Sequence, residues 1–412
     1  MACICSLTAS EHRADYDVIP LPKEVTVDTT QTFSLASGMG ISYDPGNEEI
    51  CRNARFLRDW VQEMTGIELL LTPNDSKAAV KLTLGIPAKK GETAGELTPQ
   101  QEEAYVMTVD KKGVHIQANK PVGIFRAGQT LRKSLPVVKD GAKSVELPFA
   151  VVKDEPRFEY RGVLLDCGRH FFTVETIKTF LDVMALHGSN QFHWHLTEDQ
   201  GWRFEVKAYP SLAPIGSVRQ ETVIGPYNSG IYDGIPYGGY YTQDDCREVL
   251  CGGNPETLVF LKTVLGELCE VFPSKYIHIG GDECRKHRWF DCPKCQAKIK
   301  ELGLVDKDGK QPRTTDSYIV SASKIYSFEP LIPEELTPEQ QKLILGPQVN
   351  LWTEHVKYPA HAFYQLLPRL GASSEVQWCL PEQKDFENFK ERLPHLKEIY
   401  EVIGVPYCKL LE

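Results

Sequence analysis

Two adjacent carboxylates are the sharpest chemical feature of the sequence. Asp282 and Glu283 follow the pair Gly280-Gly281, and glycines let a backbone and a ligand approach closely. Neighbouring carboxylates repel each other, so one can stay protonated near neutral pH and act as a general acid. Two acids that cleave a glycosidic bond together usually stand about 5–9 Å apart, which adjacent residues fit poorly. They fit better if one acid protonates the leaving oxygen and the other holds a substrate group that itself acts as nucleophile.

Other residues could bind the same kind of substrate. Trp352 offers a flat apolar face for a sugar ring, and Arg169 and Glu354 can donate to and accept from hydroxyl groups. Polar side chains follow four predicted strands: Asp166 and Arg169, then His193, His195, Glu198 and Asp199, then Asp282 and Glu283, then Trp352 and Glu354. Singly, such an Asp is often a turn or helix cap and such a His a core residue. Their coincidence at four strand ends favours a functional site.

The elements that would position these residues alternate between strand and helix. Residues 162–166 form an apolar run, residues 174–187 have helical spacing that Gly188 ends, and residues 190–196 form the next strand. This repeat predicts a parallel sheet. Further along, the patterns predict a helix after Asn254-Pro255, strands at 276–280 and 343–352, and helices at 359–367 and 386–402.

The first 150 or so residues predict a small α+β domain without clustered catalytic residue types. Helical patterns cover residues 47–66 and 121–135, and strand patterns cover residues 79–86, 104–109 and 114–118. Asp154-Glu-Pro156 has the composition of a linker. We therefore expect an accessory domain over residues 17–154 and a second domain over residues 155–412.

Composition excludes several classes of function. The chain has 412 residues, a net charge of −10, 42% hydrophobic residues and a pI near 5.7. This acidic balance makes nucleic acid an unfavourable partner, and no stretch approaches the ~18 apolar residues that span a bilayer. The first residues have neither a basic segment nor an apolar run, so the sequence predicts no signal peptide.

One group of cysteines leaves its chemistry open. Cys284, His287, Cys292 and Cys295 could bind zinc, but they contain a single C-x-x-C pair. A local disulfide and plain thiols are the alternatives, and plain thiols are favoured.

The longer motifs resemble the family 20 glycoside hydrolases, the β-N-acetylhexosaminidases. The resemblance covers about residues 17–405. It rests on Arg161-Gly-Val-Leu-Leu-Asp-Cys-Gly-Arg-His170, Phe192-His-Trp-His-Leu-Thr-Glu-Asp-Gln-Gly-Trp202, His278-Ile-Gly-Gly-Asp-Glu283, Leu351-Trp-Thr-Glu354 and the stretch from Leu367-Pro-Arg-Leu370 to Glu375-Val-Gln-Trp378. It implies a (β/α)8 TIM-type barrel after the accessory domain. It also implies removal of terminal β-linked N-acetylglucosamine or N-acetylgalactosamine with retention, by substrate-assisted catalysis and without a metal or organic cofactor.

The resemblance also implies a role for each candidate residue. Glu283 would be the general acid/base, and Asp282 would orient the 2-acetamido group whose oxygen attacks the anomeric carbon. Arg169 and Glu354 would bind the outer hydroxyls of the sugar, and Trp352 would form the wall behind the acetamido methyl. His195 and Glu198 would support the acid without touching the sugar. Family members are often exported, although this chain gives no localisation signal.

Two stretches lack strands that a complete barrel needs. The pattern over residues 242–254 passes from one helix to the next without a strand, and relatives carry a proline-glycine-histidine motif there that is absent here. Residues 305–330 contain loop and a weak pattern where relatives place three more strands. We therefore expect a barrel shortened near residue 250 and at 305–330. A compacted active barrel, a non-catalytic amino-sugar-binding relative and a truncated inactive chain remain alternatives.

Overall fold

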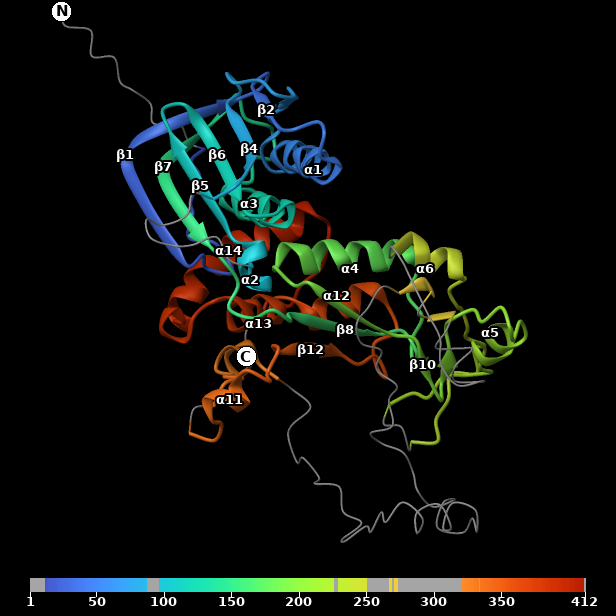
Figure 1. Ribbon diagram of the computed structural model, residues 1–412. Coiled ribbons are helices and arrows are strands. Elements are labelled where there is room, and N and C mark those ends of the chain that lie inside the picture. The colour runs from blue at the N-terminus through green and yellow to red at the C-terminus, as the bar shows by residue number, and fades with distance from the viewer. Residues whose placement is uncertain are drawn as a thin grey trace, which may run out of the picture. The chain divides into compact units, whose positions relative to one another are not determined.

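A computed structural model describes residues 12–86, 96–225, 229–249, 267, 268, 270–272, 320–332 and 334–410 (Figure 1). The chain divides into two compact units. One comprises Met1–Glu205, Tyr209–Thr242 and Ser321–Glu412, and the other comprises Val206–Ala208 and Gln243–Val320. In the second unit the described helix is α6 (Gln243–Val249).

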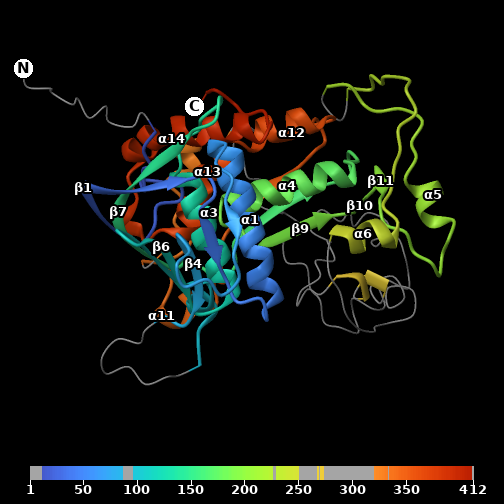
Figure 2. The same ribbon diagram turned by 90° about the horizontal axis from the view of Figure 1, so that it is seen from above.

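A seven-stranded mixed sheet organises the first part of the chain, in the order β1-β7-β5-β6-β4-β2-β3. Its strands are β1 (Glu24–Ala36), β2 (Gly40–Ser42), β3 (Leu70–Leu71), β4 (Val80–Leu84), β5 (Tyr105–Asp110), β6 (Gly113–Ala118) and β7 (Ser144–Asp154). β5 and β6 form an antiparallel hairpin, and β4 lies parallel to β6. Helices α1 (Glu48–Thr65) and α3 (Pro121–Ser134) lie side by side on this sheet (Figure 2), and α2 (Pro99–Glu103) packs on α3.

Local sequence explains where α1 begins and ends. Asn47 caps its first turn by accepting hydrogen bonds from the backbone of Glu49 and Ile50. Gly66 ends it in the left-handed conformation, with φ of 74°. The apolar residues at helical spacing are buried: Ile50, Ala54, Leu57, Val61 and Met64. The predicted helix over 47–66 is therefore confirmed, as is the hairpin of β5 and β6.

A second sheet is parallel and has the order β12-β8-β9. Its strands are β8 (Gly162–Asp166), β9 (Gln191–His195) and β12 (Gln348–Leu351), and α4 (Val174–Leu186) connects β8 to β9. The predicted strand–helix–strand repeat is confirmed. The expected strand over 343–352 is shorter, because Leu343 and Ile344 continue a turn by donating to the carbonyls of Gln340 and Gln341.

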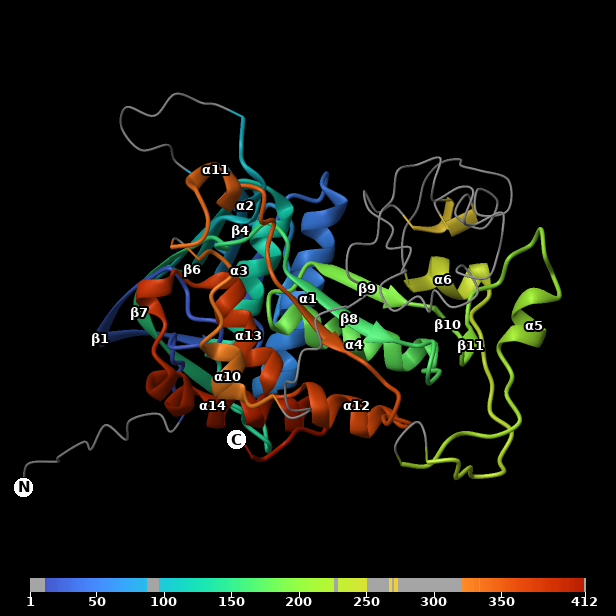
Figure 3. The ribbon, with the colours of Figure 1, turned by 90° about the horizontal axis from the view of Figure 1, so that it is seen from below.

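Shorter elements and the last helices complete the described part of the chain. They are the strands β10 (Thr197–Glu198) and β11 (Gly201–Trp202), the helices α5 (Leu212–Gly216), α10 (Ala322–Tyr326), α11 (Pro338–Gln341), α12 (Pro359–Leu366), α13 (Arg369–Trp378) and α14 (Phe386–Val402), and the short η1 (Pro381–Gln383). Figure 3 shows α10 beside α13, with which it makes close contact. None of the helices in the described part of the chain is long and apolar enough to cross a membrane.

Candidate active site

The carboxyl ends of β8, β9 and β12 bring together the described candidate residues. Asp166 ends β8 opposite His195 of β9, and Leu351 ends β12 opposite Leu165 of β8. Chain segments that leave neighbouring parallel strands at the same edge must lie close together. The loops after these strands carry Arg169, Glu198, Trp352 and Glu354.

Asp166 is fully buried and holds the loop that carries Arg169. Its side chain accepts hydrogen bonds from the backbone N–H of Gly168 (2.9 Å), Arg169 (3.1 Å) and Thr353 (3.0 Å). Three N–H donors satisfy a buried carboxylate without a ligand. Asp166 therefore positions two loops, those after β8 and β12, and does not face the substrate as a free acid.

Arg169 is the centre of a charged cluster. Its Nη2 lies 3.2 Å from Glu198 Oε1 and 3.6 Å from Glu354 Oε1, and its Nη1 lies 3.3 Å from Asp166 Oδ2. Its Nε donates to Gln200 Oε1 at 3.2 Å. Burial lowers the pKa of the guanidinium, but Asp166, Glu354 and Glu198 outweigh this and raise it. Two of these carboxylates, Glu198 and Glu354, are partly exposed, so they can still accept from ligand hydroxyls.

Trp352 stands over this cluster with much of its ring in the open. Its side chain is 41% exposed, and the Arg169 guanidinium lies 5.3 Å from the ring centroid. The ring of His195 meets it edge-on, with centroids 5.2 Å apart and an interplanar angle of 84°. His195 Nε2 lies 3.4 Å from Glu198 Oε1. The structure thus brings Arg169, His195, Glu198, Trp352 and Glu354 into one group.

Thr353 and His170 lock the loops after β8 and β12 together. The Thr353 hydroxyl donates to the carbonyl of Asp166 at 2.9 Å and accepts from the backbone of His170 at 3.3 Å. His170 Nδ1 lies 2.5 Å from the carbonyl of Thr353. Since a carbonyl only accepts, Nδ1 carries the hydrogen. Burial lowers the pKa of His170 to about 4, so the ring is neutral at neutral pH.

Residues 217–225 and 229–241 form a ribbon that hydrogen-bonds to the loop after β8. Its bridges pair Arg219 with Tyr237 and Val223 with Tyr232. The buried Arg203 donates to the carbonyls of Cys167, Gly168, Ser217 and Gly239, and so joins the ribbon to the end of β8. Arg219 Nη1 donates to the carbonyl of Arg169 at 2.8 Å.

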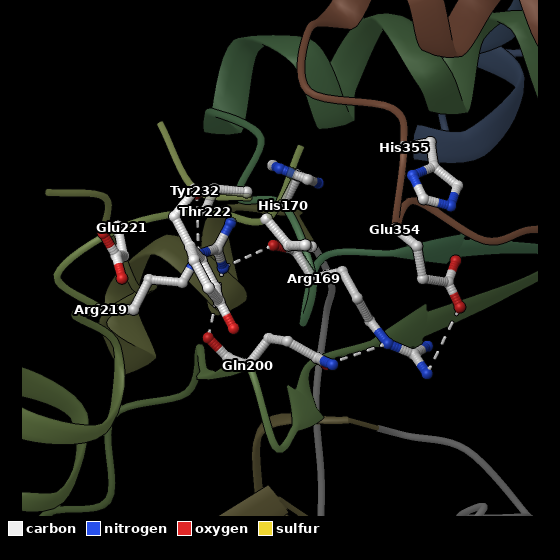
Figure 4. A pocket seen from close by; sticks show the side chains of 10 residues that line it. Arg169, His170, Gln200, Arg219, Glu221, Thr222, Tyr232, Glu354 and His355 are labelled. Atoms are coloured by element: carbon white, nitrogen blue, oxygen red, sulfur yellow. Dashed lines mark hydrogen bonds and ion pairs between the residues drawn. The ribbon is translucent and has the colours of Figure 1, made fainter. Parts of the chain in front are cut away.

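The ribbon and the two loops enclose a pocket of about 170 Å³. Figure 4 shows Arg219, Thr222 and Tyr232 on one side, Glu354 and His355 on the other, and His170 and Gln200 between them. Arg169, Glu221 and Val223 complete the lining. Neither Trp352 nor His195 lines this pocket, although both contact the Arg169 cluster.

Several predicted features lie outside the described residues. These are the strand over 276–280, Asp282 and Glu283, and the cysteine group from Cys284 to Cys295. The described residues contain no group of three or more metal-ligating side chains.

Comparison with models of known protein families shows which enzymes are related to the chain. The catalytic domain of Glycosyl hydrolase family 20 matches residues 158–251, 248–311 and 305–381, and domain 2 of the same family matches residues 15–155. The chain belongs to glycosyl hydrolase family 20. The family 20 catalytic match is divided at residues 248–251 and 305–311.

Relatives and solved structures agree with this family. A "Beta-hexosaminidase" of Porphyromonas gingivalis is 28% identical over an alignment of 547 positions, which covers 98% of the chain and 68% of that protein. One of Vibrio furnissii is 34% identical over 257 residues, 50% of the chain, and the chain spans only 41% of it. The structure of a GH20 exo β-N-acetylglucosaminidase of Vibrio harveyi with N-acetylglucosamine matches with a TM-score of 0.75 at 22% identity, over 97% of the chain and 80% of that protein. At 22% identity, this match shows a similarity of fold and nothing more specific.

Sequence reasoning missed several residues at the site. Gln200 and His170 lie inside the motifs that carry the family resemblance, so an inspection of each motif residue would have found them. Arg219, Thr222 and Tyr232 lie in a ribbon with no strand pattern or motif of its own. Only the folded chain brings them to Arg169.

Proposed function

We propose that the chain is an exo-acting β-N-acetylhexosaminidase that removes terminal β-linked N-acetylglucosamine or N-acetylgalactosamine from glycans with retention. The observation that carries the proposal is the group at the carboxyl ends of β8, β9 and β12 in a chain of family 20. A half-buried arginine there is shared between partly exposed carboxylates beside an open tryptophan face. Such a set of charged donors, acceptors and a flat apolar face binds a sugar ring.

The described residues receive distinct roles in this proposal. Arg169 and Glu354 bind the outer hydroxyls of the sugar, because one donates and the other accepts, and their 3.6 Å pairing holds both in place. Trp352 forms the wall behind the acetamido methyl. His195 and Glu198, whose side chains lie 3.4 Å apart, support the general acid.

The chemical step is assigned to Asp282 and Glu283. Glu283 gives its proton to the leaving glycosidic oxygen, while Asp282 holds the 2-acetamido group so that its carbonyl oxygen attacks the anomeric carbon. Water, deprotonated by Glu283, then opens the cyclic intermediate with overall retention. These two roles are assigned from the positions of the residues in the motif Gly280-Gly281-Asp282-Glu283.

The proposed architecture is an accessory domain over residues 17–154 and a (β/α)8 barrel over residues 155–412, shortened near 250 and at 305–330. Three parallel strands, β12-β8-β9, support the barrel. The shortening is supported by the divided family match and by the alignment with the P. gingivalis protein, which extends over 547 positions and must therefore leave gaps in this chain of 412 residues. The same shortening favours a second candidate, a relative that binds amino sugars without hydrolysing them.

Hydrolysis of a chromogenic N-acetyl-β-glucosaminide by the purified full chain tests the proposal. Wild type should turn over, and Glu283→Gln should lower kcat by about 10²–10⁴-fold because the general acid is lost. Glu391→Gln, an exposed change on α14, should leave kcat unaltered. A cooperatively melting wild type without turnover would overturn the proposal. If a nonhydrolysable N-acetylglucosamine analogue still raised its Tm, the binding-only candidate would replace it.

A further inference from the structure

Arg219 holds the backbone of the loop that carries Arg169. Its Nη1 donates to the carbonyl of Arg169 at 2.8 Å and to the carbonyl of Gln200 at 3.3 Å (Figure 4). The side chains of these two residues are joined as well, because Arg169 Nε donates to Gln200 Oε1 at 3.2 Å. One nitrogen of Arg219 therefore fixes the distance between two backbone segments whose side chains hydrogen-bond to each other.

Tyr237 holds the residue that lies two positions further along the same loop. Its hydroxyl accepts from the N–H of Phe171 at 2.9 Å and donates to the carbonyl of that residue at 3.3 Å. Its ring meets the ring of His170 edge-on, with centroids 5.3 Å apart. Arg219 and Tyr237 together thus contact three consecutive residues, 169–171.

Arg219 and Tyr237 also fix each other. Each donates its backbone N–H to the carbonyl of the other, at 2.8 and 2.9 Å, and the Arg219 guanidinium lies 4.4 Å from the centroid of the tyrosine ring. Nε of Arg219 donates to the Thr222 hydroxyl at 3.0 Å. Side chains that are held by stacking and by several hydrogen bonds present their remaining donors in one orientation, so the pair forms a clamp on residues 169–171.

The orientation of the Arg169 guanidinium depends on where its backbone lies. Its Nη2 is 3.2 Å from Glu198 and 3.6 Å from Glu354, and a displacement of about 1 Å is enough to break such contacts. A role for Arg219 in balancing charge is less well supported. Within the described residues it makes no ion pair with a carboxylate, and its donors go to two carbonyls and one hydroxyl instead.

We propose that Arg219 is a positioning residue for Arg169. Together with Tyr237, it fixes the backbone of residues 169–171 and of Gln200, so that the Arg169 guanidinium stays aimed at the outer hydroxyls of the terminal sugar. The inference rests on the function proposed above, in which Arg169 binds these hydroxyls. It adds that sugar binding depends on two ribbon residues that act through Arg169 and need no contact with the sugar.

A double-mutant cycle with Arg169 tests the inference. The measurements are calorimetric Kd values for a sulfur-linked, nonhydrolysable N-acetylglucosaminide, and the kcat and KM of the full chain on a chromogenic N-acetyl-β-glucosaminide. Arg219→Met should raise Kd and KM about tenfold and lower kcat by no more than about threefold, because a misplaced Arg169 loses contacts that it makes in both the ground state and the transition state. In the Arg169→Met chain the same change should raise Kd by less than about twofold, since no guanidinium is left to position.

Two further variants separate position from charge. Arg219→Lys retains the charge, but an ammonium lacks the planar, stacked fork, so Kd should stay about fivefold above that of wild type. A wild-type Kd for this variant would show that Arg219 supplies charge alone and would overturn the inference. Tyr237→Phe removes only the hydroxyl that holds Phe171 and should raise Kd about threefold. If Arg219→Met did not melt cooperatively, Tyr237→Phe with and without Arg169→Met would complete the same cycle.

Arg157→Met is the matched control. The Arg157 side chain also pairs across the fold, with Glu329 at 2.6 Å, and its guanidinium lies 4.7 Å from the ring centroid of Phe158, but neither partner belongs to the loops that carry the site. This change should lower Tm and leave Kd unaltered. Equal effects of Arg219→Met with and without Arg169 would overturn the inference while the proposed function stands. A cooperatively melting wild type that neither binds the analogue nor hydrolyses the substrate would overturn the proposed function, and this inference with it.

Discussion

Arginines stand at both ends of strand β8, and their surroundings differ. Arg161, at the amino end, has a 1% exposed side chain that lies 2.5 Å from Glu103 and donates to the carbonyls of Phe158 and Gly188. Arg169, beyond the carboxyl end, is 14% exposed and is shared among three carboxylates. Each guanidinium faces a tryptophan, at 5.0 Å for Trp378 and 5.3 Å for Trp352. An arginine and a tryptophan are therefore paired at both ends of β8. The pair at the amino end is shielded from solvent, and the pair at the carboxyl end is accessible to it.

Two histidines repeat this contrast. His187, near the amino ends of the strands, has both ring nitrogens paired, one with the carbonyl of Val183 and one with the hydroxyl of Tyr400, each at 2.8 Å. His170, near the carboxyl ends, has Nε2 unpaired among the described residues. Burial lowers the pKa of each to about 4. Arg161 and His187 at the amino end are thus paired within the protein, whereas Nε2 of His170 at the carboxyl end is not, as expected if the carboxyl end binds a ligand.

The largest expected effect is on stability and belongs to the amino end. Arg161→Met should lower the free energy of unfolding by about 3–5 kcal/mol, because two buried carbonyls lose their donor and Glu103 loses one of its two arginines. Urea denaturation measures it. Arg52→Met, which removes an exposed pair 3.9 Å long, is the control and should cost under about 0.5 kcal/mol. If Arg161→Met lowered the free energy of unfolding by less than about 1 kcal/mol, the buried contacts at the amino end of β8 would not stabilise the fold as inferred.

The next effect is a pH dependence at the same end. The folded pKa of His187 lies near 4, below its unfolded value of about 6.5, so the unfolded chain binds the proton first as pH falls. The free energy of unfolding should therefore fall between about pH 6.5 and pH 4, by up to about 3 kcal/mol from this residue. His170 acts in the same sense. Urea denaturation across this window should show a shallower slope of unfolding free energy against pH for His187→Gln than for the control His361→Gln, which changes a partly exposed histidine. Equal slopes would contradict the assignment.

At the carboxyl end of β8, a substitution should lower activity much more than stability. Arg169→Met should lower kcat/KM about 100-fold, since charge-assisted hydrogen bonds to the sugar are lost, yet change the free energy of unfolding by only about 1 kcal/mol. The small stability cost follows because Asp166 keeps three backbone N–H donors. Arg169→Lys should recover part of the activity through its charge but lack the planar fork. A collapse in stability like that of Arg161→Met would erase the contrast between the two ends.

Much of the fold was predictable because the local signals are strong. Asn47 and Gly66 bound α1, the Asp110–Gly113 turn joins β5 to β6, and α14 runs over Phe386–Val402 as predicted. The long strands β1 and β7 and helix α13 were not predicted. β1 is exposed over most of its length and lacks a clear alternation, and α13 is almost wholly buried and lacks an amphipathic pattern.

The candidate site was predictable to the extent that motifs mark it. Arg169, His195, Glu198, Trp352 and Glu354 were predicted from strand ends and family motifs, and the structure places them in one group. Their roles, like those of Asp282 and Glu283 and the two domain boundaries, stay predictions. The ribbon of Arg219 and Tyr232 could not be predicted, because its contacts with Arg169 depend on long-range hydrogen bonds through Arg203 rather than on local pattern.

The smallest expected effect on activity belongs to Thr353, at the carboxyl end of the parallel strands. Thr353 is fully buried, and its hydroxyl joins the loops that carry Arg169 and Glu354. Thr353→Val keeps the shape but leaves the carbonyl of Asp166 and the N–H of His170 without this partner, so unfolding should become easier by about 1–2 kcal/mol. The kcat/KM on a chromogenic N-acetyl-β-glucosaminide should fall about threefold, chiefly through KM, because Trp352 and Glu354 flank the residue and bind the sugar. Thr353→Ser retains the hydroxyl and should restore KM. If Ser and Val behaved alike, the hydroxyl would not position the sugar-binding loops, and packing of the methyl group alone would explain the residue.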